Sequence, residues 1–417
     1  MSTANLKTKQ FLFLQGPISP LFRKTAAILK RHGHFVLRVN LCFGDKLLWG
    51  NDLDSVDFHG KMADFGEYIA NIIKAHDITD LVLISEQRSY HKIAIEQAKK
   101  NGVQVIVTDL GYLRPDWITL ELNGISRESL FPKDPEIIKV MAKNLPYPNM
   151  TQIYVDKFWY DVSLDMMYHI STILLKFKFP FYKTYLVYHP IINYLGVLRH
   201  IILRKFSTKK TANLIDNLIL KKIDYFVLAM QLEQDYQIRE YSPYESQLEV
   251  LDEVIQSFSM YIKTTNNSSK LIIKIHPLDP LLINWKKKVR DIADKFDVTK
   301  NVIVILGGDL TLLLKYSRGL IVVNSSVGVR AIMLGVPVLT LGDALYNIEG
   351  LVTTKDDLAT FWLEYKAAEP ELRDAFIKLL SSTIQIKGGY YNKPGIDNAA
   401  KIAAYRLEHG LVNQIIN

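Results

Sequence analysis

Short apolar runs, each followed by an amphipathic stretch of helix length, constrain the fold of this 417-residue chain more than any other feature of its sequence. In the first half, strands are predicted at 11–17, 34–41, 81–86 and 103–109, with helices between them. Continuous apolar strands separated by helices are typical of a parallel sheet that is covered on both faces. The first half is therefore predicted to be a Rossmann-like α/β domain.

The second half repeats this pattern. Its strands are predicted at 224–230, 271–277, 302–308, 319–325 and 336–342, with helices at 244–265 and 399–411. Two Rossmann-like domains predict a central ligand cleft, because ligands of open parallel sheets bind beyond the carboxyl ends of the strands. The predicted organisation is a first domain over 1–155, a basic helical segment over 156–222, a second domain over 223–395 and a C-terminal helix over 396–417 that packs back.

The segment 156–222 carries the excess charge of the chain. Lys and Arg number 51 against 43 Asp and Glu, and eleven basic and three acidic residues from Lys157 to Lys222 account for the whole net charge of +8. Many Leu and Ile residues accompany its aromatics, which disfavours a nucleic-acid surface. Pro180 and Arg199 interrupt the apolar run, which disfavours a spanning helix. A helix pair lying on an anionic bilayer is favoured, and the alternative is an inter-domain helical hairpin with a solvated basic face.

The single cysteine and the N-terminal residues narrow the class of protein. Cys42 alone excludes a disulfide framework and a paired-cysteine metal site within one chain. Residues 1–10 are polar and form no apolar stretch of secretory length, so a cytosolic location is expected. Neither a metal nor a resident cofactor is predicted.

Polar residues stand at the ends of the strands predicted in the second half. They are Gln231, Glu233 and Asp235, then Lys274, His276 and Pro277, then Gly307, Gly308 and Asp309, and finally Asn324, Ser325 and Ser326. Ser325 and Ser326 open a predicted helix, whose free N–H groups and dipole favour a phosphate. The alternative is that one of the two serines only caps the helix. No Walker motif or complete dinucleotide motif accompanies them.

Lys274 and His276 share one face of their predicted strand, an arrangement that suits an anion. Pro277 holds the preceding residue extended, so the imidazole leaves the strand end in a defined direction. A histidine can neutralise or protonate a departing phosphate oxygen. The alternative for His276 is a structural hydrogen bond.

Carboxylates complete the candidate set. Asp235 follows a buried strand, and Asp109 and Glu121 bracket a Gly-Tyr-Leu-Arg-Pro stretch in the first half. Glycosyl transfer or hydrolysis needs a nucleophile or base and an acid on opposite sides of the anomeric carbon, and acids across a cleft suit this chemistry. The alternative is that they serve as helix caps or as partners of Arg114 and Arg239.

Further polar groups gather at the strand ends of the first domain. The candidates for the acceptor side of the cleft are Gln15, Gly16, Arg38, Asn40, Arg88, His91, Arg114 and Glu121. The arginines at 38 and 88 are suited to meet a carboxylate or phosphate through two parallel hydrogen bonds. Gly16 either lets a ligand approach the backbone or only forms a tight strand-to-helix turn.

Several of these stretches resemble the capsular polysaccharide KpsS (LipB) family. They recur in order from Phe11 to Leu351 and include FLFLQGPISPLFRK, GHFVLRVNLCFGDKLLW, GYLRPDWITLE, QLEQDYQIREYSPY, KIHPLDP, GGDL, NSSVGVRAIMLGVPV and LGDALYNIEGL. The resemblance implies a GT-B fold and a retaining β-Kdo transferase that takes Kdo (3-deoxy-manno-octulosonic acid) from CMP-β-Kdo. It implies a (lyso)phosphatidylglycerol acceptor, which receives the poly-Kdo linker of a Gram-negative capsule. The expected location is then the inner face of the inner membrane, with other capsule linker and export proteins as partners.

The resemblance also implies roles for single residues. By motif position Asp235 is the carboxylate nucleophile, and net retention follows from a double displacement. Asp109 stands where related sequences usually carry glutamate, and it is the candidate for activating the acceptor. The donor phosphate is expected at the serine pair and its cytosine at Gly307–Asp309. The stretch around Arg88 and His91 keeps only the acid, the arginine and the histidine of the Gly-Asp-x-Arg-Pro-x-His pattern expected for the family.

Two other functions remain as alternatives. A nucleotide-sugar 2-epimerase shares the double-Rossmann scaffold and a phosphate-binding site, but its reaction does not require a lipid-facing basic segment. A non-catalytic capsule assembly or export factor would bind polysaccharide at the membrane and would not need Asp235.

Overall fold

The computed structural model describes residues 7–155, 158–233 and 235–416. The expected domain boundary at 155/156 and Lys157 of the basic segment therefore fall on or beside residues outside this description. The chain forms two compact units, each with its own sheet. Unit 1 comprises residues 1–131, 144–185 and 377–417, and unit 2 comprises residues 132–143 and 186–376.

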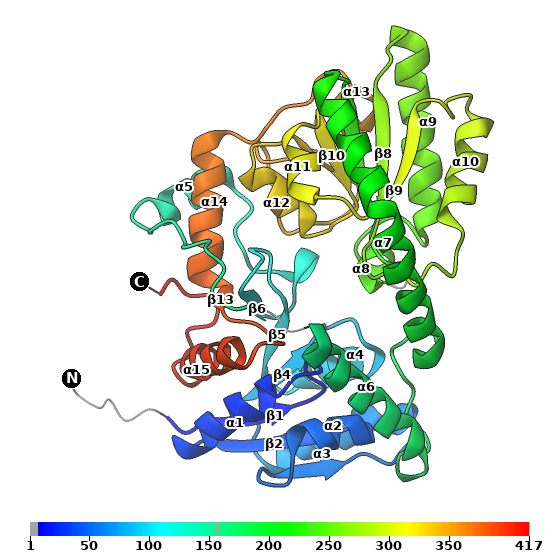
Figure 1. The fold of residues 1–417 in the computed structure, drawn as a ribbon. Coiled ribbons are helices and arrows are strands. Elements are labelled where there is room, and N and C mark those ends of the chain that lie inside the picture. The colour runs from blue at the N-terminus through cyan, green and yellow to red at the C-terminus, as the bar shows by residue number, and fades with distance from the viewer. Residues whose placement is uncertain (1–6, 156–157, 234, 417) are drawn as a thin grey trace. The chain divides into compact units, whose positions relative to one another are not determined.

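Unit 1 is built on a seven-stranded sheet (Figure 1). Its strands, in spatial order, are β13 (Gln385–Lys387), β6 (Trp117–Leu122), β5 (Gln104–Leu110), β4 (Asp80–Ile84), β1 (Gln10–Phe13), β2 (Phe35–Asn40) and β3 (Ser55–Asp57). The pairs from β5 to β3 are parallel, whereas β6 runs antiparallel to both of its neighbours. This arrangement brings the carboxyl ends of β1, β2, β4 and β5 to one edge of the sheet.

Helices cover both faces of this sheet, because side chains along each strand alternate between two apolar clusters. Phe11 and Phe13 of β1 pack on one side with α1 (Leu21–Arg31) and α15 (Lys393–Glu408). Leu12 and Leu14 pack on the other side with α3 (Phe65–Ala75) and α4 (Ser89–Lys100). The remaining elements of unit 1 are α2 (Phe43–Trp49), η1 (Met62–Asp64), η2 (Ser126–Glu128), α6 (Phe158–Leu174) and η3 (Lys176–Lys178).

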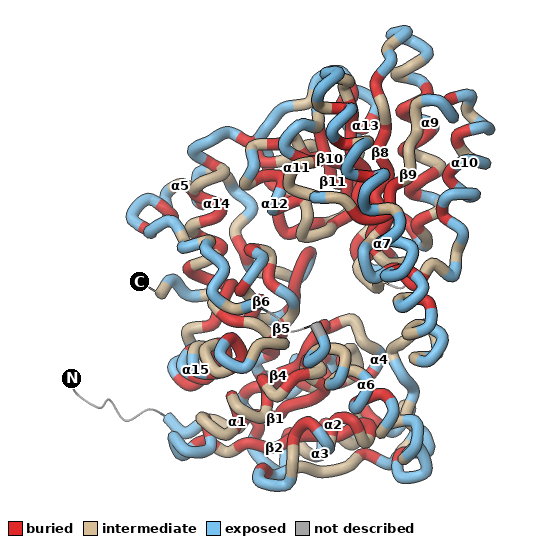
Figure 2. Tube along the Cα trace, in the orientation of Figure 1, coloured by how far each residue is buried: buried red, intermediate tan, exposed pale blue. Residues whose placement is uncertain are grey.

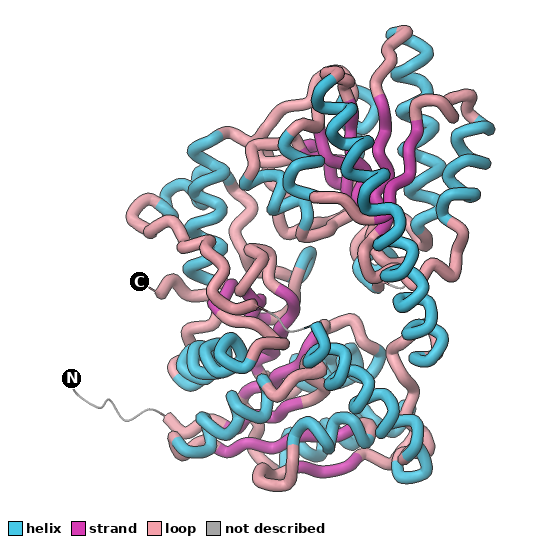
Figure 3. The backbone as a smooth tube through the Cα atoms, in the orientation of Figure 1, coloured by secondary structure: helices cyan, strands magenta, loops and turns pink. Residues whose placement is uncertain are grey.

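Unit 2 is built on a six-stranded sheet in which every pair is parallel (Figure 3). Its strands, in spatial order, are β12 (Thr353–Thr354), β11 (Val338–Thr340), β10 (Gly319–Val322), β7 (Tyr225–Ala229), β8 (Lys270–Ile275) and β9 (Val302–Leu306). Its helices are α5 (Pro135–Ala142), α7 (Pro190–Leu220), α8 (Tyr236–Glu240), α9 (Gln247–Thr265), α10 (Trp285–Lys295), α11 (Leu310–Lys315), α12 (Val327–Met333), η4 (Lys355–Asp357) and α13 (Leu358–Phe361). The helix α14 (Pro370–Thr383) leads from unit 2 into unit 1.

The prediction of two Rossmann-like units is confirmed, and the central strands of each sheet are buried (Figure 2). In unit 2 the apolar runs at β7, β8 and β10 pack against α9 and α10 in one continuous core. A continuous apolar run identifies a strand that is covered on both faces, which explains why these elements were readable from the sequence.

The predicted end of the second domain at residue 395 is corrected by the structure. Residues 377–417 belong to unit 1, because β13 completes its sheet and α15 packs on its α1. Ile386 pairs with Ile118 in that sheet. A strand of three residues is too short to show a recognisable sequence pattern, and its partner β6 is distant in the chain. The sequence therefore assigned this stretch to the preceding domain.

The basic segment 156–222 is likewise not one body. Its described residues up to 185, including α6, belong to unit 1, and those from 186, including α7, belong to unit 2. Tyr168 and Phe179 are buried in unit 1, which gives the first part a packing role that composition alone did not indicate. Within the described part of the chain, no helix combines the length and apolar character required to cross a bilayer.

Candidate functional site

The candidate ligand-binding residues of unit 2 lie at one edge of its sheet, since its strands are all parallel. They stand in or after four adjacent strands: β10, β7, β8 and β9. In that order they are Asn324, Ser325 and Ser326, then Gln231 and Asp235, then Lys274, His276 and Pro277, then Gly307, Gly308 and Asp309. The structure thus gathers at one edge the groups that the sequence suggested from separate strand ends.

Asp235 is oriented by a hydrogen-bond network that joins residues following β7 and β10. Its Oδ1 accepts a hydrogen bond from Gln237 N–H at 3.0 Å, and Gln231 Nε2 lies 3.4 Å from its Oδ2. Gln231 also exchanges two hydrogen bonds with Asn324: Gln231 Nε2 donates to Asn324 Oδ1 at 2.9 Å, and Asn324 N–H donates to Gln231 Oε1 at 3.1 Å. This network fixes the Asp235 carboxylate beside the chain that enters the serine pair.

The two serines of that pair make different contacts. Ser325 Oγ accepts from Val327 N–H at 3.3 Å, and the Ser325 carbonyl oxygen accepts from the Tyr346 hydroxyl. Ser326 occupies the N-cap position of α12, yet its side chain makes no capping bond there. Helix capping therefore explains Ser325 but leaves the Ser326 hydroxyl for another partner.

Lys274 is a buried cation near the end of β8. Its ammonium donates to the carbonyl oxygen of Gly307. The Arg204 side chain packs closely against Gly307. A Cβ at Gly307, where φ is +84°, would lie 3.1 Å from Arg204 Cγ. Burial and the nearby Arg204 charge lower the pKa of Lys274 to about 8, against the opposing influence of Asp309. A buried lysine with a lowered pKa is typical of a functional site.

Replacing Lys274 with methionine is expected to stabilise the protein at pH 7 by about 1–2 kcal/mol. The unfolded chain keeps the lysine proton up to about pH 10.5, whereas the folded chain releases it near pH 8. Protonated Lys274 therefore favours unfolding at neutral pH, and its cost disappears as the pH rises from 8 to about 10.5. Urea unfolding of both proteins at pH 7 and pH 10 should show the difference shrinking at the higher pH. A methionine variant less stable than wild type at pH 7 would contradict this expectation.

His276 and Asp309 are oriented by local hydrogen bonds. His276 Nδ1 accepts from Leu278 N–H at 3.2 Å, so a neutral imidazole carries its proton on Nε2. Asp309 caps α11 by accepting from Thr311 N–H at 2.8 Å and from Leu312 N–H at 3.1 Å. The histidine is thereby set to donate through Nε2. The capping role predicted as an alternative for the carboxylates applies to Asp235, which caps α8, and Asp309 is also a helix cap.

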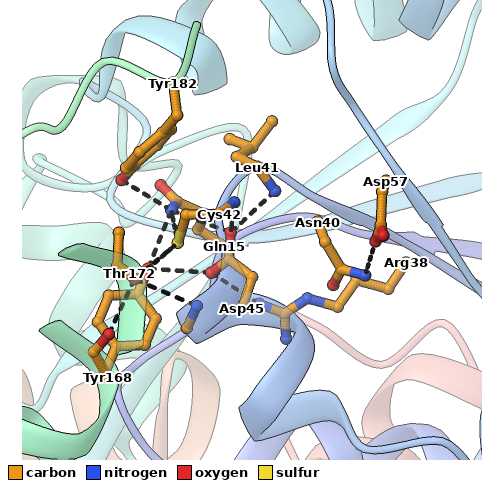
Figure 4. Close-up of polar contacts among 11 residues, drawn as sticks. Gln15, Arg38, Asn40, Leu41, Cys42, Asp45, Asp57, Tyr168, Thr172 and Tyr182 are labelled. Carbon is orange, nitrogen blue, oxygen red and sulfur yellow. Dashed lines mark hydrogen bonds and ion pairs between the residues drawn. The ribbon is translucent and has the colours of Figure 1, made fainter. Parts of the chain in front are cut away.

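A buried polar cluster lies beside the carboxyl ends of β1 and β2 in unit 1 (Figure 4). Asp45, only 1% exposed, is its centre. The Asp45 carboxylate accepts five hydrogen bonds of 3.0 to 3.3 Å, from Arg38 Nη2, Gln15 Nε2, the Tyr168 hydroxyl, Leu41 N–H and Cys42 N–H. The guanidinium of Arg38 also lies 5.3 Å from the centre of the Trp49 ring. Arg38 and Gln15, predicted for acceptor binding, are thus engaged in holding the strand ends together.

Tyrosines of the basic segment complete the unit 1 site, and sequence patterns did not reveal them. Gln15 Nε2 donates to the hydroxyls of Tyr168 at 3.1 Å and Tyr182 at 3.2 Å, although these residues are 153 and 167 positions away in the chain. The Arg88 guanidinium stacks on the ring of Tyr185 at 3.7 Å. The available signal in the sequence was that these aromatic residues are tyrosines. Their hydroxyl groups indicate polar contacts, which a purely lipid-facing segment does not need.

Three more predicted residues of unit 1 are accounted for by packing. His91 is buried, and its Nδ1 lies 3.0 Å from the Ser85 carbonyl oxygen. Burial and the Arg88 charge lower the pKa of His91 to about 3, so its ring is neutral. Asn40 Nδ2 donates to Asp57 Oδ1 at 2.9 Å. A Cβ at Gly16 would lie 2.5 Å from the ring of Phe22, so that close packing alone explains the glycine.

The remaining predicted residues lie on β5, β6 and the turn between them. Asp109 accepts from Ser85 Oγ at 3.0 Å and from Leu110 N–H at 2.7 Å. Glu121 is fully buried in β6 and accepts from the Ser129 hydroxyl. Arg114 is exposed, and its Nε donates to the Gly111 carbonyl oxygen at 3.1 Å. Asp109 is the more accessible of the two acids.

The fold and these strand-end groups define an α/β protein of two sheets that collects polar and charged side chains beyond its parallel strands. Residues 79–391 match the family described as capsule polysaccharide biosynthesis protein. The chain therefore belongs to the capsule polysaccharide biosynthesis protein family, and the predicted resemblance is confirmed.

Individual relatives support this membership along nearly the whole chain. The chain is 25% identical to the capsule polysaccharide export protein KpsS of Escherichia coli, over 93% of this chain and 98% of the relative. It is 27% identical to the capsule polysaccharide modification protein LipB of Neisseria meningitidis, over 92% of each. Among solved structures, KpsC of Thermosulfurimonas dismutans, a β-Kdo 2,7 transferase, is 14% identical with a TM-score of 0.46, over 96% of this chain and 99% of that one.

Proposed function

We propose that this capsule biosynthesis protein is a retaining β-Kdo transferase. It moves Kdo from CMP-β-Kdo to a (lyso)phosphatidylglycerol acceptor and thereby starts the linker of a capsular polysaccharide. The observation that carries this proposal is the Gln231–Asn324 pair, which presents the Asp235 carboxylate at the same sheet edge as the serine pair and Lys274. A nucleophile and a set of phosphate-binding groups are the two requirements for transfer from a nucleotide-activated sugar.

The first chemical step is displacement of CMP by Asp235. A carboxylate oxygen of Asp235 attacks the anomeric carbon of Kdo, the bond from that carbon to the phosphate oxygen breaks, and CMP leaves with the electron pair. Lys274, the Nε2 proton of His276 and the Ser326 hydroxyl are the groups that offset the charge of the departing phosphate. Their role in the proposal requires no metal ion.

The second step releases Kdo from Asp235 to the acceptor. An acceptor hydroxyl attacks the anomeric carbon, Asp235 leaves as a free carboxylate, and Asp109 takes the hydroxyl proton. Each displacement inverts the anomeric carbon, so the two together retain its configuration. The hydrogen bonds from Ser85 Oγ and Leu110 N–H orient the Asp109 carboxylate.

A lipid acceptor lies in a membrane, so the protein needs a surface that binds membranes. The helix α7 has an exposed face of suitable chemistry. Ile191, Leu195, Leu198, Ile202 and Phe206, here called the α7 stripe, recur at helical spacing and are 48% to 80% exposed. The opposite face packs on unit 2, where His200 Nδ1 lies 2.7 Å from the Asp279 carbonyl oxygen. Lys209 continues the face of the stripe, and residues 166–215 contain no acidic residue. Exposed apolar side chains next to lysines favour docking on an anionic bilayer.

Replacing Lys209 and Lys210 with glutamate is expected to weaken binding to vesicles that contain phosphatidylglycerol by about 1 kcal/mol for each positive charge removed. The measurement is sedimentation with such vesicles and with neutral ones at the same ionic strength. Glutamates at Lys286 and Lys288, which are exposed on α10 of the same unit, are the matched control and should have little effect. Equal losses in both variants would show that net charge, and not the α7 surface, drives binding.

The function itself is tested by mixing the purified protein, CMP-Kdo regenerated in situ and lysophosphatidylglycerol, and then measuring the mass of the lipid. A gain of one or more Kdo units supports the proposal. Conversion of UDP-GlcNAc to its 2-epimer, with no change in the lipid, would instead identify an epimerase. No reaction with either substrate, combined with polysaccharide binding, would favour the non-catalytic alternative.

A further inference from the structure

Arg88 is a cation in unit 1 that forms no ion pair with a carboxylate of the described residues. Its guanidinium carbon lies 3.7 Å from the centre of the Tyr185 ring, and the structure shows neither an ion pair nor a hydrogen bond from the guanidinium to any residue it describes. A guanidinium is always charged, carries five N–H donors and holds no acceptor. The stacked arrangement fixes the plane of these donors, and none of the described residues accepts a hydrogen bond from them.

Donor groups of α4 and of Tyr182 lie near Arg88. Arg88 is the N-cap residue of the 12-residue helix α4, and its side chain makes no capping bond, so the first turn adds N–H groups and a positive dipole end. Tyr182 lies within range of the Arg88 charge and already accepts from Gln15 Nε2, which leaves its own O–H to donate. His91, three residues further along α4, is fully buried and uncharged. Its Nδ1 donates to the Ser85 carbonyl oxygen, so its Nε2, which has no partner among the residues described, is an acceptor.

Asp45, a carboxylate whose charge also acts on Arg88, is already engaged with other donors. Asp45 already accepts five hydrogen bonds, one of them from the buried Arg38 at 3.1 Å. A carboxylate engaged in this way has little acceptor capacity left for a second arginine. Among the residues that the structure describes, Arg88 therefore forms no ion pair, and an anionic ligand would supply the missing partner.

We propose that Arg88, Tyr182 and the first turn of α4 form an oxyanion site that binds the acceptor substrate in unit 1. This inference rests on the proposed function, because it assigns the anion to the molecule that receives Kdo. A phosphate and a carboxylate share the chemistry that a stacked arginine recognises, namely two oxygens that accept parallel N–H bonds. The lipid headgroup supplies a phosphate, and a Kdo residue already attached to the lipid supplies a carboxylate.

Calorimetric titration of the full chain with two probes, sn-glycerol 1-phosphate and free Kdo, tests the site without donor or turnover. At least one probe is expected to bind the wild-type protein, and Arg88→Gln should weaken that binding about 10- to 100-fold. Arg88→Lys should recover part of the affinity, because the charge remains but the paired geometry is lost. Arg31→Gln, at an exposed arginine of α1 in the same unit, is the matched control and should bind as wild type does.

The two probes separate the sources of the anion. Dependence of glycerol phosphate binding on Arg88 assigns the site to the headgroup, and dependence of Kdo binding assigns it to an added sugar. The proposal is overturned if Arg88→Gln binds both probes as tightly as wild type does, even where its melting temperature falls, since Arg88 would then be structural. Because no transfer is measured, the site can be established even if the lipid assay fails.

Discussion

Changing Asp235 to asparagine is expected to reduce Kdo transfer by at least about 10⁴-fold, because a side-chain amide cannot form the glycosyl intermediate. Asparagine keeps the size of the residue and can still accept from Gln237 N–H, which caps α8. The loss should therefore appear in kcat, with the melting temperature and the affinity for CMP close to those of wild type. The measurements are the mass assay on lysophosphatidylglycerol, thermal unfolding and CMP titration.

Two comparisons sharpen this result. Asp235→Ala should lose transfer too, but it also removes the cap of α8 and should cost about 1 kcal/mol of stability. Asp134→Asn changes another capping aspartate of unit 2, which accepts from Glu136 N–H and Ile137 N–H at the start of α5, and should retain full activity. An Asp235→Asn variant with near wild-type transfer would remove Asp235 as the nucleophile while leaving the donor-binding groups in place.

The contrast between the two candidate sites shows what a sequence can and cannot predict here. In unit 2 each group stands directly at the end of a continuous apolar strand, so locating the strands also located Gln231, Lys274 and Ser326. The parallel order of β10, β7, β8 and β9 then brings them to one edge. The pairing of Gln231 with Asn324, 93 residues apart, required the fold itself.

The unit 1 site depends on contacts that no local pattern encodes. Tyr168 reaches Asp45 from a position 123 residues further along the chain. Its segment is basic and aromatic. Those properties identify the exposed α7 stripe as apolar surface but give no sign that Tyr168 is buried. The C-terminal boundary failed for the same reason, since the partner of Gln385 is Thr119 and only the completed sheet reveals the pairing.

Changing Asp45 to alanine is expected to destabilise the protein by about 3–5 kcal/mol, the typical cost of removing one partner of a buried ion pair. Arg38, 3% exposed, would be left with an uncompensated charge, and Gln15 and Tyr168 would each lose an acceptor. The unfavourable term is the stranded guanidinium more than the lost contact. Urea unfolding at constant pH measures the change.

The control is Asp52→Ala in the same unit, which removes the ion pair with Arg23 at 2.7 Å. Both partners of that pair are roughly half exposed, so its loss should cost no more than about 1 kcal/mol. If the cost at Asp45 arises from stranding Arg38, then adding Arg38→Met to Asp45→Ala should recover part of the lost stability. A double variant less stable than Asp45→Ala alone would instead mean that Arg38 contributes mainly through its contact with Trp49, 5.3 Å from its guanidinium.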